Sequence, residues 1–290
     1  MIRHSQLFVL LSLLLLTACV AGTQDSAQNT IADSLAPFVE EIYPTTSKIP
    51  ENILRFYIYF SEPIKEGATV KSVHVFNEDG SEVNVYSPDS DSTGIFLETL
   101  EELWDPEYQR ITLILDPGRV KTDLQANSEL GRSFESGKKY VLEIDTEIES
   151  LSGKNLASTF RKEFEVIKED RIPPDFTNWN IVIPRKNTSD PIKIEFNDIL
   201  DHAQMVSFIR VYDSSNSSLK GEVKLGHEET VWEFYPTTEW KSGKYYFKVD
   251  VRLEDLAGNN IQGVFDRDRR VDNLSFLDQK EITLEFSILR

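Results

Sequence analysis

The chain's histidines and its single cysteine are the side chains best suited to nucleophilic or metal chemistry. A serine or cysteine nucleophile needs a general base within hydrogen-bond reach. His74 falls in a segment of alternating apolar residues, and His202 and His227 lie in stretches without a nucleophile motif such as Gly-x-Ser-x-Gly. These residues predict no hydrolytic site. We expect that the protein is not an enzyme and that it holds no cofactor.

A candidate metal loop lies between Asp266 and Asn273, where aspartates stand at alternating spacing. A calcium loop is built from oxygen ligands around a sharp glycine turn. This run contains no glycine, and three arginines are interleaved with its aspartates. The pattern favours a self-paired surface over a calcium loop, so we expect no metal site.

The position of Cys19 is more informative than its chemistry. Residues 1–18 contain a basic start and an apolar run from Leu7 to Leu16, which is too short for a membrane span and is typical of a secretory signal. The junction Leu16-Thr17-Ala18-Cys19 resembles a bacterial lipobox, which implies cleavage before Cys19 and lipid attachment to its sulfur. The alternative is an ordinary signal peptide with an accidental cysteine.

Lipid attachment would anchor the protein to a membrane, and the residue after the cysteine indicates which membrane. Each buried methylene contributes about 0.8 kcal/mol, so several acyl chains hold a protein permanently on a membrane. Val20 follows the cysteine where an aspartate could stand, which resembles an outer-membrane address if the cell has an outer membrane. Residues 19–37 are polar and small, which favours a flexible tether. We therefore expect an exported protein anchored to the cell envelope.

The charge balance narrows the class of partner. Lys and Arg total 31 against 49 Asp and Glu, which gives a formal net charge of −18. A chain this acidic repels nucleic acid and anionic lipid surfaces. We expect no nucleic-acid partner, and the partners that remain are the membrane through Cys19 and an envelope protein or polysaccharide.

The chain contains one short pattern twice. Residues 136–156 start with Ser-Gly-Lys-Lys-Tyr, continue as an alternating segment and end with Leu-Ser-Gly-Lys-Asn-Leu. Residues 242–261 repeat this order with Ser-Gly-Lys-Tyr-Tyr and Leu-Ala-Gly-Asn-Asn-Ile. Each copy predicts a turn, a strand of period two and a glycine turn. Two copies in 290 residues favour two domains, each large enough for its own core.

The remaining strands can be placed in both halves. Alternating or β-branched runs bounded by turn residues predict strands, and Asn77-Glu78-Asp79-Gly80 predicts a hairpin turn. The expected domains are 38–169 and 170–290, joined by the short, proline-bearing segment Asp170–Pro174. The expected strands are 39–43, 54–60, 70–76, 82–86 and 110–115 in the first domain, and 191–196, 206–212, 230–236 and 281–288 in the second.

These landmarks resemble a known family. Phe60-Ser61-Glu62-Pro63-Ile64, a proline before a late strand, Gly-x-x-Tyr and Leu-Ala-Gly-Asn are similar to bacterial Ig-like domains of the S-layer-associated type. The resemblance covers roughly residues 38–270 and also extends to two-domain lipoproteins of unassigned function. It implies an all-β fold of two tandem Ig-like β-sandwiches and a non-enzymatic scaffold or adhesion module. It also explains the acidic turn at Glu254, Asp255 and Asn259 as structural.

The two halves differ in one long loop. The late prolines Pro117 and Pro236 are 119 residues apart, whereas the Ser-Gly-Lys turns at Ser136 and Ser242 are 106 apart, so the first half has 119 − 106 = 13 extra residues. Long loops on a β scaffold often bind ligands. The alternative is that the loops pair their charges and cover a sheet edge. The candidate binding residues here and in the stretch 98–109 are Trp104, Arg119, Lys121 and Arg132.

The tryptophans test a related hypothesis of sugar stacking. Trp232 alternates with Phe234, so both are expected in the core of the second half. They correspond in the repeat to Leu113 and Leu115 of the first half, which are also expected to be buried. Trp240 stands where the family has an apolar anchor. Only Trp179 and Trp104 remain candidates for exposed stacking residues. The leading hypothesis is a scaffold or adhesion module, and the alternative is a carbohydrate- or ligand-binding surface lipoprotein that uses the long loops of the first domain.

Overall fold

The computed structural model describes residues 36–67, 71–85, 94–97, 102–122, 124–266 and 279–289, which belong to one compact unit. Cys19, the expected signal and most of the tether lie outside the described residues. Among the described residues, no helix is long and apolar enough to span a membrane.

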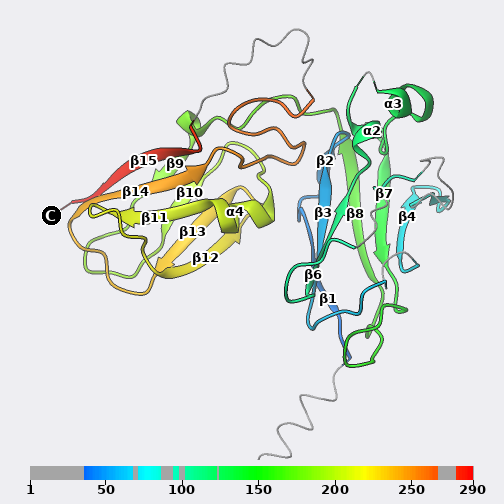
Figure 1. Cartoon of the computed structure of the whole chain (residues 1–290), viewed down its shortest axis with the longest axis horizontal. Helices are drawn as coiled ribbons and strands as arrows, with labels where there is room; N and C mark the ends of the chain where they lie inside the picture. The colour runs from blue at the N-terminus through cyan, green and yellow to red at the C-terminus, as the bar shows by residue number, and fades with distance from the viewer. Residues whose placement is uncertain are drawn as a thin grey trace, which may run out of the picture. The chain divides into compact units, whose positions relative to one another are not determined.

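The first half of the chain contains two sheets (Figure 1). The smaller sheet has the antiparallel order β1-β3-β6. The larger has the order β2-β8-β7-β4-β5, in which the short β2 runs parallel to β8. The strands are β1 (Val39–Tyr43), β2 (Lys48–Pro50), β3 (Arg55–Phe60), β4 (Val73–Asn77), β5 (Glu82–Val83), β6 (Arg110–Ile114), β7 (Lys139–Ile144) and β8 (Phe160–Ile167).

Alternation along these strands builds the first core. In β7, Tyr140, Leu142 and Ile144 are buried while the residues between them are more exposed, as expected when one face of a sheet packs inward. Buried side chains of both sheets form one hydrophobic cluster, which makes this half a β-sandwich. Leu113 and Leu115 are buried in that cluster, as the sequence predicts.

The second half also contains two sheets. Their orders are β12-β13-β10-β9 and β11-β14-β15, and Figure 1 shows β14 between β11 and β15. β14 and β15 stay in one unbroken register from Gly243–Ile288 to Asp250–Glu281. The strands are β9 (Asn180–Val182), β10 (Ile192–Glu195), β11 (Ile209–Asp213), β12 (Gly221–Gly226), β13 (Val231–Pro236), β14 (Gly243–Asp250) and β15 (Glu281–Ile288).

The second core is aromatic. Trp232 is fully buried, as expected, and its ring stacks on Phe234 and meets Phe247 edge to face. Trp240 is also buried and contacts Phe286. Large rings packed this way contribute contact energy beyond the area they bury. The placement of Trp232, Phe234 and Trp240 confirms the prediction.

One expected strand is partly a helix. Residues 206–212 were predicted as a strand, but α4 spans His202–Phe208 and β11 begins only at Ile209. The Asp201 side chain accepts a hydrogen bond from the Gln204 N–H at 3.0 Å, which is the N-cap arrangement that starts a helix. The apolar residues from Val206 onward also fit a strand, so the sequence pattern favours a strand over the helix that Asp201 caps.

The extra loop of the first half contains two short helices. These are α2 (Pro117–Val120), capped by the side chain of Asp116, and α3 (Gln125–Leu130). A single 3-10 turn, η1 (Phe176–Asn178), precedes β9. All helices in the described residues are short, and the fold is all-β with two sandwiches, as the sequence predicts.

Candidate functional site

The second copy of the repeated turn lies against the first sandwich. Leu256 and Phe265 pack on the first hydrophobic cluster, and the Leu54 N–H donates to the Leu256 carbonyl at 2.8 Å. Gly258 has φ +78°, and a Cβ there would lie 2.8 Å from Leu54 Cδ2. Glycine is therefore required by backbone conformation and by close packing. This turn is the apolar part of a junction between the two halves.

A buried carboxylate forms the polar part of the junction. The Tyr57 hydroxyl donates to both carboxylate oxygens of Asp201, at 3.0 Å and 2.8 Å. Arg55 approaches Asp201 at 3.6 Å and forms an ion pair with Glu254. Burial raises the pKa of Asp201, and the charge of Arg55 opposes that rise. The Asp201 carboxylate thus has its side-chain partners, Tyr57 and Arg55, in the other half of the chain, which limits the cost of its burial.

A second polar contact uses Glu229, which is buried in the turn before β13. Its carboxylate accepts hydrogen bonds from the Thr45 backbone N–H at 2.9 Å and from the Thr45 hydroxyl at 2.8 Å. Next to it, the His202 ring packs against Tyr43 and Tyr59. Burial, together with the charge of Arg110, lowers the pKa of His202 to about 4. His202 is therefore neutral at ordinary pH.

The joint between the halves, the segment Asp170–Pro174, is held by hydrogen bonds between its backbone and a side chain of the first half. The Asn52 side chain donates to the Asp170 carbonyl at 2.7 Å and accepts from the Asp170 N–H at 2.8 Å. A third contact ties Asp266 to the extra loop, since its carboxylate accepts from the Thr122 hydroxyl at 2.7 Å and pairs with Arg171 at 2.8 Å. The start of the short connection is therefore bonded to the first half.

Three carboxylates meet at this joint. One oxygen from each of Asp170, Asp198 and Asp255 lies within 4.8 Å of the others. Burial raises the pKa of Asp255 to about 8, with the two neighbouring carboxylates adding to the rise and a hydrogen bond from Asn259 opposing it. Burial and the charge of Asp170 raise the pKa of Asp198 to about 6. Carboxylate oxygens are ligands for hard cations such as Ca²⁺, so these three could hold one.

The sequence gives no local sign of this cluster, because its members come from three separate segments. The acidic run that was considered for calcium begins at Asp266, and its remainder from 267 lies outside the described residues. The carboxylate of Asp266 already accepts a hydrogen bond from Thr122 and forms an ion pair with Arg171. The expectation that the chain holds no metal stays a prediction.

Arg119, a candidate binding residue, is buried. Its guanidinium donates to the carbonyls of Gly131 at 3.2 Å, Gly94 at 3.2 Å and Arg132 at 2.9 Å. Burial lowers its pKa. These bonds close the extra loop against the strand-like segment at 94–97, which is a structural use of the side chain. Ligand binding by Arg119 stays a prediction.

The other loop candidates also have contacts inside the molecule. Arg132 pairs with Glu51 at 3.3 Å and with Glu169. The Lys121 ammonium lies 4.2 Å from the centre of the Phe265 ring. The structure does not bring Trp104 together with these cations through any described contact. Its ring packs on the first core beside Phe60, and its Nε1–H donates to Glu102 at 2.8 Å.

The expectation for Trp179 is wrong. This side chain was a candidate for an exposed stacking residue, but it is only 8% exposed and meets Phe196 edge to face at 4.9 Å. Trp179 directly follows η1 and belongs to the second hydrophobic cluster. Short polar neighbours in the sequence concealed its burial.

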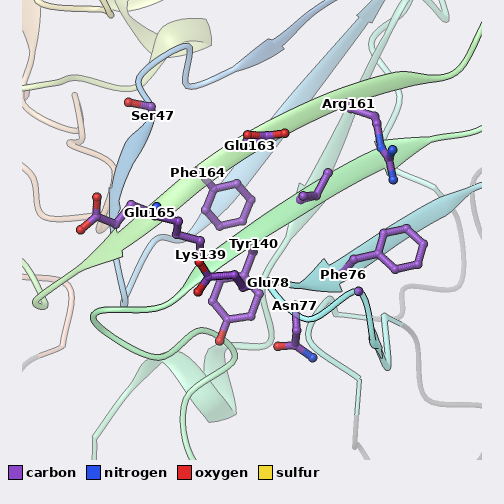
Figure 2. A pocket seen from close by; sticks show the side chains of 12 residues that line it. Ser47, Phe76, Asn77, Glu78, Lys139, Tyr140, Arg161, Glu163, Phe164 and Glu165 are labelled. Atoms are coloured by element: carbon purple, nitrogen blue, oxygen red, sulfur yellow. The ribbon is translucent and has the colours of Figure 1, made fainter.

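A groove of about 690 Å³ lies on the larger sheet of the first half (Figure 2). Residues of β8 and β7 line its floor, and Phe76 with the turn that follows β4 lines one side. Of the β8 residues in the groove, Arg161 and Glu163 are exposed and Glu165 is half-buried. Sequence reasoning missed this groove because its lining residues are the solvent-facing positions of ordinary alternating strands.

No protein-family model and no curated protein matches the chain. Solved structures match at low similarity. Domains 1–6 of the surface layer protein SbsC are 17% identical with a TM-score of 0.30, over 78% of this chain and 26% of that chain. The MG0-NIE-MG1 domains of Escherichia coli alpha-2-macroglobulin are 8% identical with a TM-score of 0.28, over 88% and 92%.

A third match is the N-terminal Ig1-2 module of the Drosophila receptor protein tyrosine phosphatase DLAR. It is 13% identical with a TM-score of 0.25, over 74% of this chain and 91% of that chain. This chain spans about a quarter of the SbsC structure. At these TM-scores the similarities carry no argument about function.

Proposed function

We propose that the protein is a non-enzymatic scaffold and interaction module of the cell envelope. In this proposal it consists of two Ig-like domains, 38–169 and 170–290, that the junction holds as one stiff unit. A lipid on Cys19 anchors the unit to a membrane, and the polar tether 19–37 separates the two. Its partner is an envelope protein or polysaccharide.

The junction is the observation that carries the proposal. Domains within a chain usually move relative to each other unless their interface is large or well fixed. Here Tyr57 and Arg55 contact Asp201 and Glu254, and the Gly258 turn packs on Leu54. A buried carboxylate that lost its partners would be costly, because an uncompensated buried charge destabilises by several kcal/mol. The halves therefore have a strong energetic reason to stay together, as a spacer or presenting scaffold requires.

The anchor is supported by sequence alone. The run from Leu7 to Leu16 followed by Thr17-Ala18-Cys19 fits export and lipid attachment. A diacylglycerol adds many buried methylenes at about 0.8 kcal/mol each, which holds a protein on a bilayer without a membrane-spanning helix.

Fractionation of a bacterial cell that makes the chain tests the proposal. The native chain should sediment with membranes and should dissolve in detergent but not in high salt. Cys19→Ala should keep its signal segment and leave the lipid-anchored fraction, while the matched variant Val20→Ile should behave like the native chain. A Cys19→Ala chain that is processed and distributed as the native one is would refute lipid anchoring.

A further inference from the structure

The groove on the larger sheet of the first half contains charged side chains without internal partners. Glu78, Glu163 and Glu165 line it together with Lys139. Among the residues that the structure describes, these four side chains make no hydrogen bond or ion pair. By contrast, Arg161 at the end of the groove pairs with Glu143 at 2.7 Å. Among the lining residues the unpaired charge is therefore three carboxylates against one ammonium group, and the exposed Lys48 stands opposite Glu165 on β2.

The arrangement of these groups is that of a strand-shaped site. Glu163 and Glu165 are two residues apart in β8, so both side chains stand on the same face of the sheet, about 7 Å apart. Val141 in β7 pairs with Glu163 on the neighbouring strand and pairs with Phe76 in β4 on its other side. Val141 and Phe76 thus continue the line across the sheet from Glu163. Figure 2 shows Glu163 and Glu165 along one strand and Phe76 on another.

We propose that this groove binds an extended, basic segment of a partner protein. The inference rests on the proposed interaction-module function and names its surface. Residues at alternating positions of an extended segment face the sheet at the same spacing as Glu163 and Glu165. Lysine or arginine side chains at these positions pair with the carboxylates, and their methylene stems cover Val141 and Phe76. The net charge of −18 attracts such a segment over distance.

The same charges disfavour other occupants. A second copy of this chain also carries −18, so two copies repel each other. Three unpaired carboxylates would repel an anionic polysaccharide, and of the unpaired lining groups only the ammonium group of Lys139 would attract it. An uncharged oligosaccharide could donate hydroxyl hydrogen bonds, but it would not use the excess of negative charge.

Binding of defined probes to the full chain, purified in detergent, tests the inference. The probe is a fluorescent acetyl-Lys-Val-Lys-Val-Lys-Val-amide peptide, and the reference probes are its Glu-Val counterpart and maltohexaose. The basic peptide should bind and should weaken as salt rises, because exposed charges are screened beyond about 8 Å at physiological ionic strength. Glu78→Gln, Glu163→Gln and Glu165→Gln combined should raise its Kd about tenfold, since exposed ion pairs contribute modestly each. Phe76→Ala should also weaken it.

A matched control separates the groove from diffuse attraction. Glu107, Glu147 and Glu239 are exposed and lie outside the groove, and their combined change to Gln alters the net charge by the same amount. This control should leave the Kd within about twofold. Equal weakening in both variants would overturn the inference, as would absence of peptide binding at millimolar concentration. Tighter binding of the acidic peptide or of maltohexaose would overturn it too. None of these results bears on membrane anchoring, so the failure of the groove and the failure of the proposed function are distinguishable.

Discussion

The hydroxyl of Tyr57 in β3 donates a hydrogen bond of 2.8 Å to Oδ2 of Asp201, 144 residues later in the chain. The same carboxylate caps α4 by accepting from the Gln204 N–H at 3.0 Å. One buried acid therefore fixes the start of a helix in the second half and contacts a strand of the first. Local structure and the junction depend on the same side chain.

Replacing Tyr57 with Phe should remove the hydroxyl while keeping the packed ring. Loss of a hydrogen bond to a buried charged group costs about 1–3 kcal/mol, so urea unfolding should show a lower free energy of unfolding by that amount. The control is Tyr235→Phe, whose hydroxyl bonds Glu233 within one half and which should change little. A Tyr57→Phe chain as stable as the native one would show that this bond does not hold the junction.

The two copies of the glycine turn offer a matched pair of variants. Gly153 has φ +80°, and a Cβ there would meet only Glu149 Oε1 at 4.0 Å, whereas at Gly258 it would overlap Leu54. Gly153→Ala should cost about 1–2 kcal/mol from left-handed strain alone. Gly258→Ala should cost about 1–3 kcal/mol more, because it also overpacks the junction. Equal losses in thermal unfolding of the two variants would mean that the Gly258 turn does not press on Leu54.

The carboxyl cluster at the joint should give an unusual pH dependence. The pKa of Asp255 is raised to about 8 and that of Asp198 to about 6, so the folded state binds these protons more tightly than the unfolded chain does. Stability from this source is fully present below the ordinary carboxyl pKa of 3.8, and its loss as pH rises is complete at about 6 for Asp198 and about 8 for Asp255. Asp255→Asn should therefore flatten the fall in melting temperature between pH 5 and 9.

This titration requires a chelator in the buffer so that no cation replaces the protons. Comparison with the native chain at each pH cancels the contributions of other titrating groups. A native chain whose stability rises steadily with pH over this window, with no difference in Asp255→Asn, would contradict the burial of the Asp255 carboxyl beside its two acidic neighbours.

The buried position of Arg119 predicts a structural effect. Arg119→Ala would leave the carbonyls of Gly94, Gly131 and Arg132 without its donors, and unsatisfied buried groups cost about 1–3 kcal/mol each. We expect a clear loss of stability in urea unfolding, whereas Lys121→Ala should lose only its ring contact, worth about 0.5–1 kcal/mol. If Arg119→Ala leaves unfolding unchanged, these three bonds do not stabilise the extra loop.

Strands and core were predictable because they follow from local periodicity. β1 and β15 have the predicted limits, and Trp232 is buried because it alternates with Phe234 along β13. The helix α4 was missed because its cap, Asp201, is a single residue before a segment that also contains strand formers. Trp179 was missed because nothing in its neighbours marks the partner ring of Phe196.

The candidate site was less predictable because its contacts are distant in sequence. Nothing in the sequence indicates that Tyr57 and Asp201 are in contact. The same holds for the cluster of Asp170, Asp198 and Asp255. The sequence predicts the glycine turn at Gly258 correctly, but its contact with Leu54 depends on how the second half packs on the first. The groove is a face of ordinary strands, and only the fold shows which of its charges have partners.

The stiffness of the junction is most directly measured as a distance distribution between the two halves. Spin labels at Glu147→Cys and Lys220→Cys, both exposed, would be measured by double electron–electron resonance in a chain with Cys19→Ser, which removes the only native thiol. A stiff junction should give one narrow distribution in the otherwise native chain and a broader one when Tyr57→Phe and Gly258→Ala are combined. A broad distribution in the native chain, unchanged by these substitutions, would contradict this stiffness.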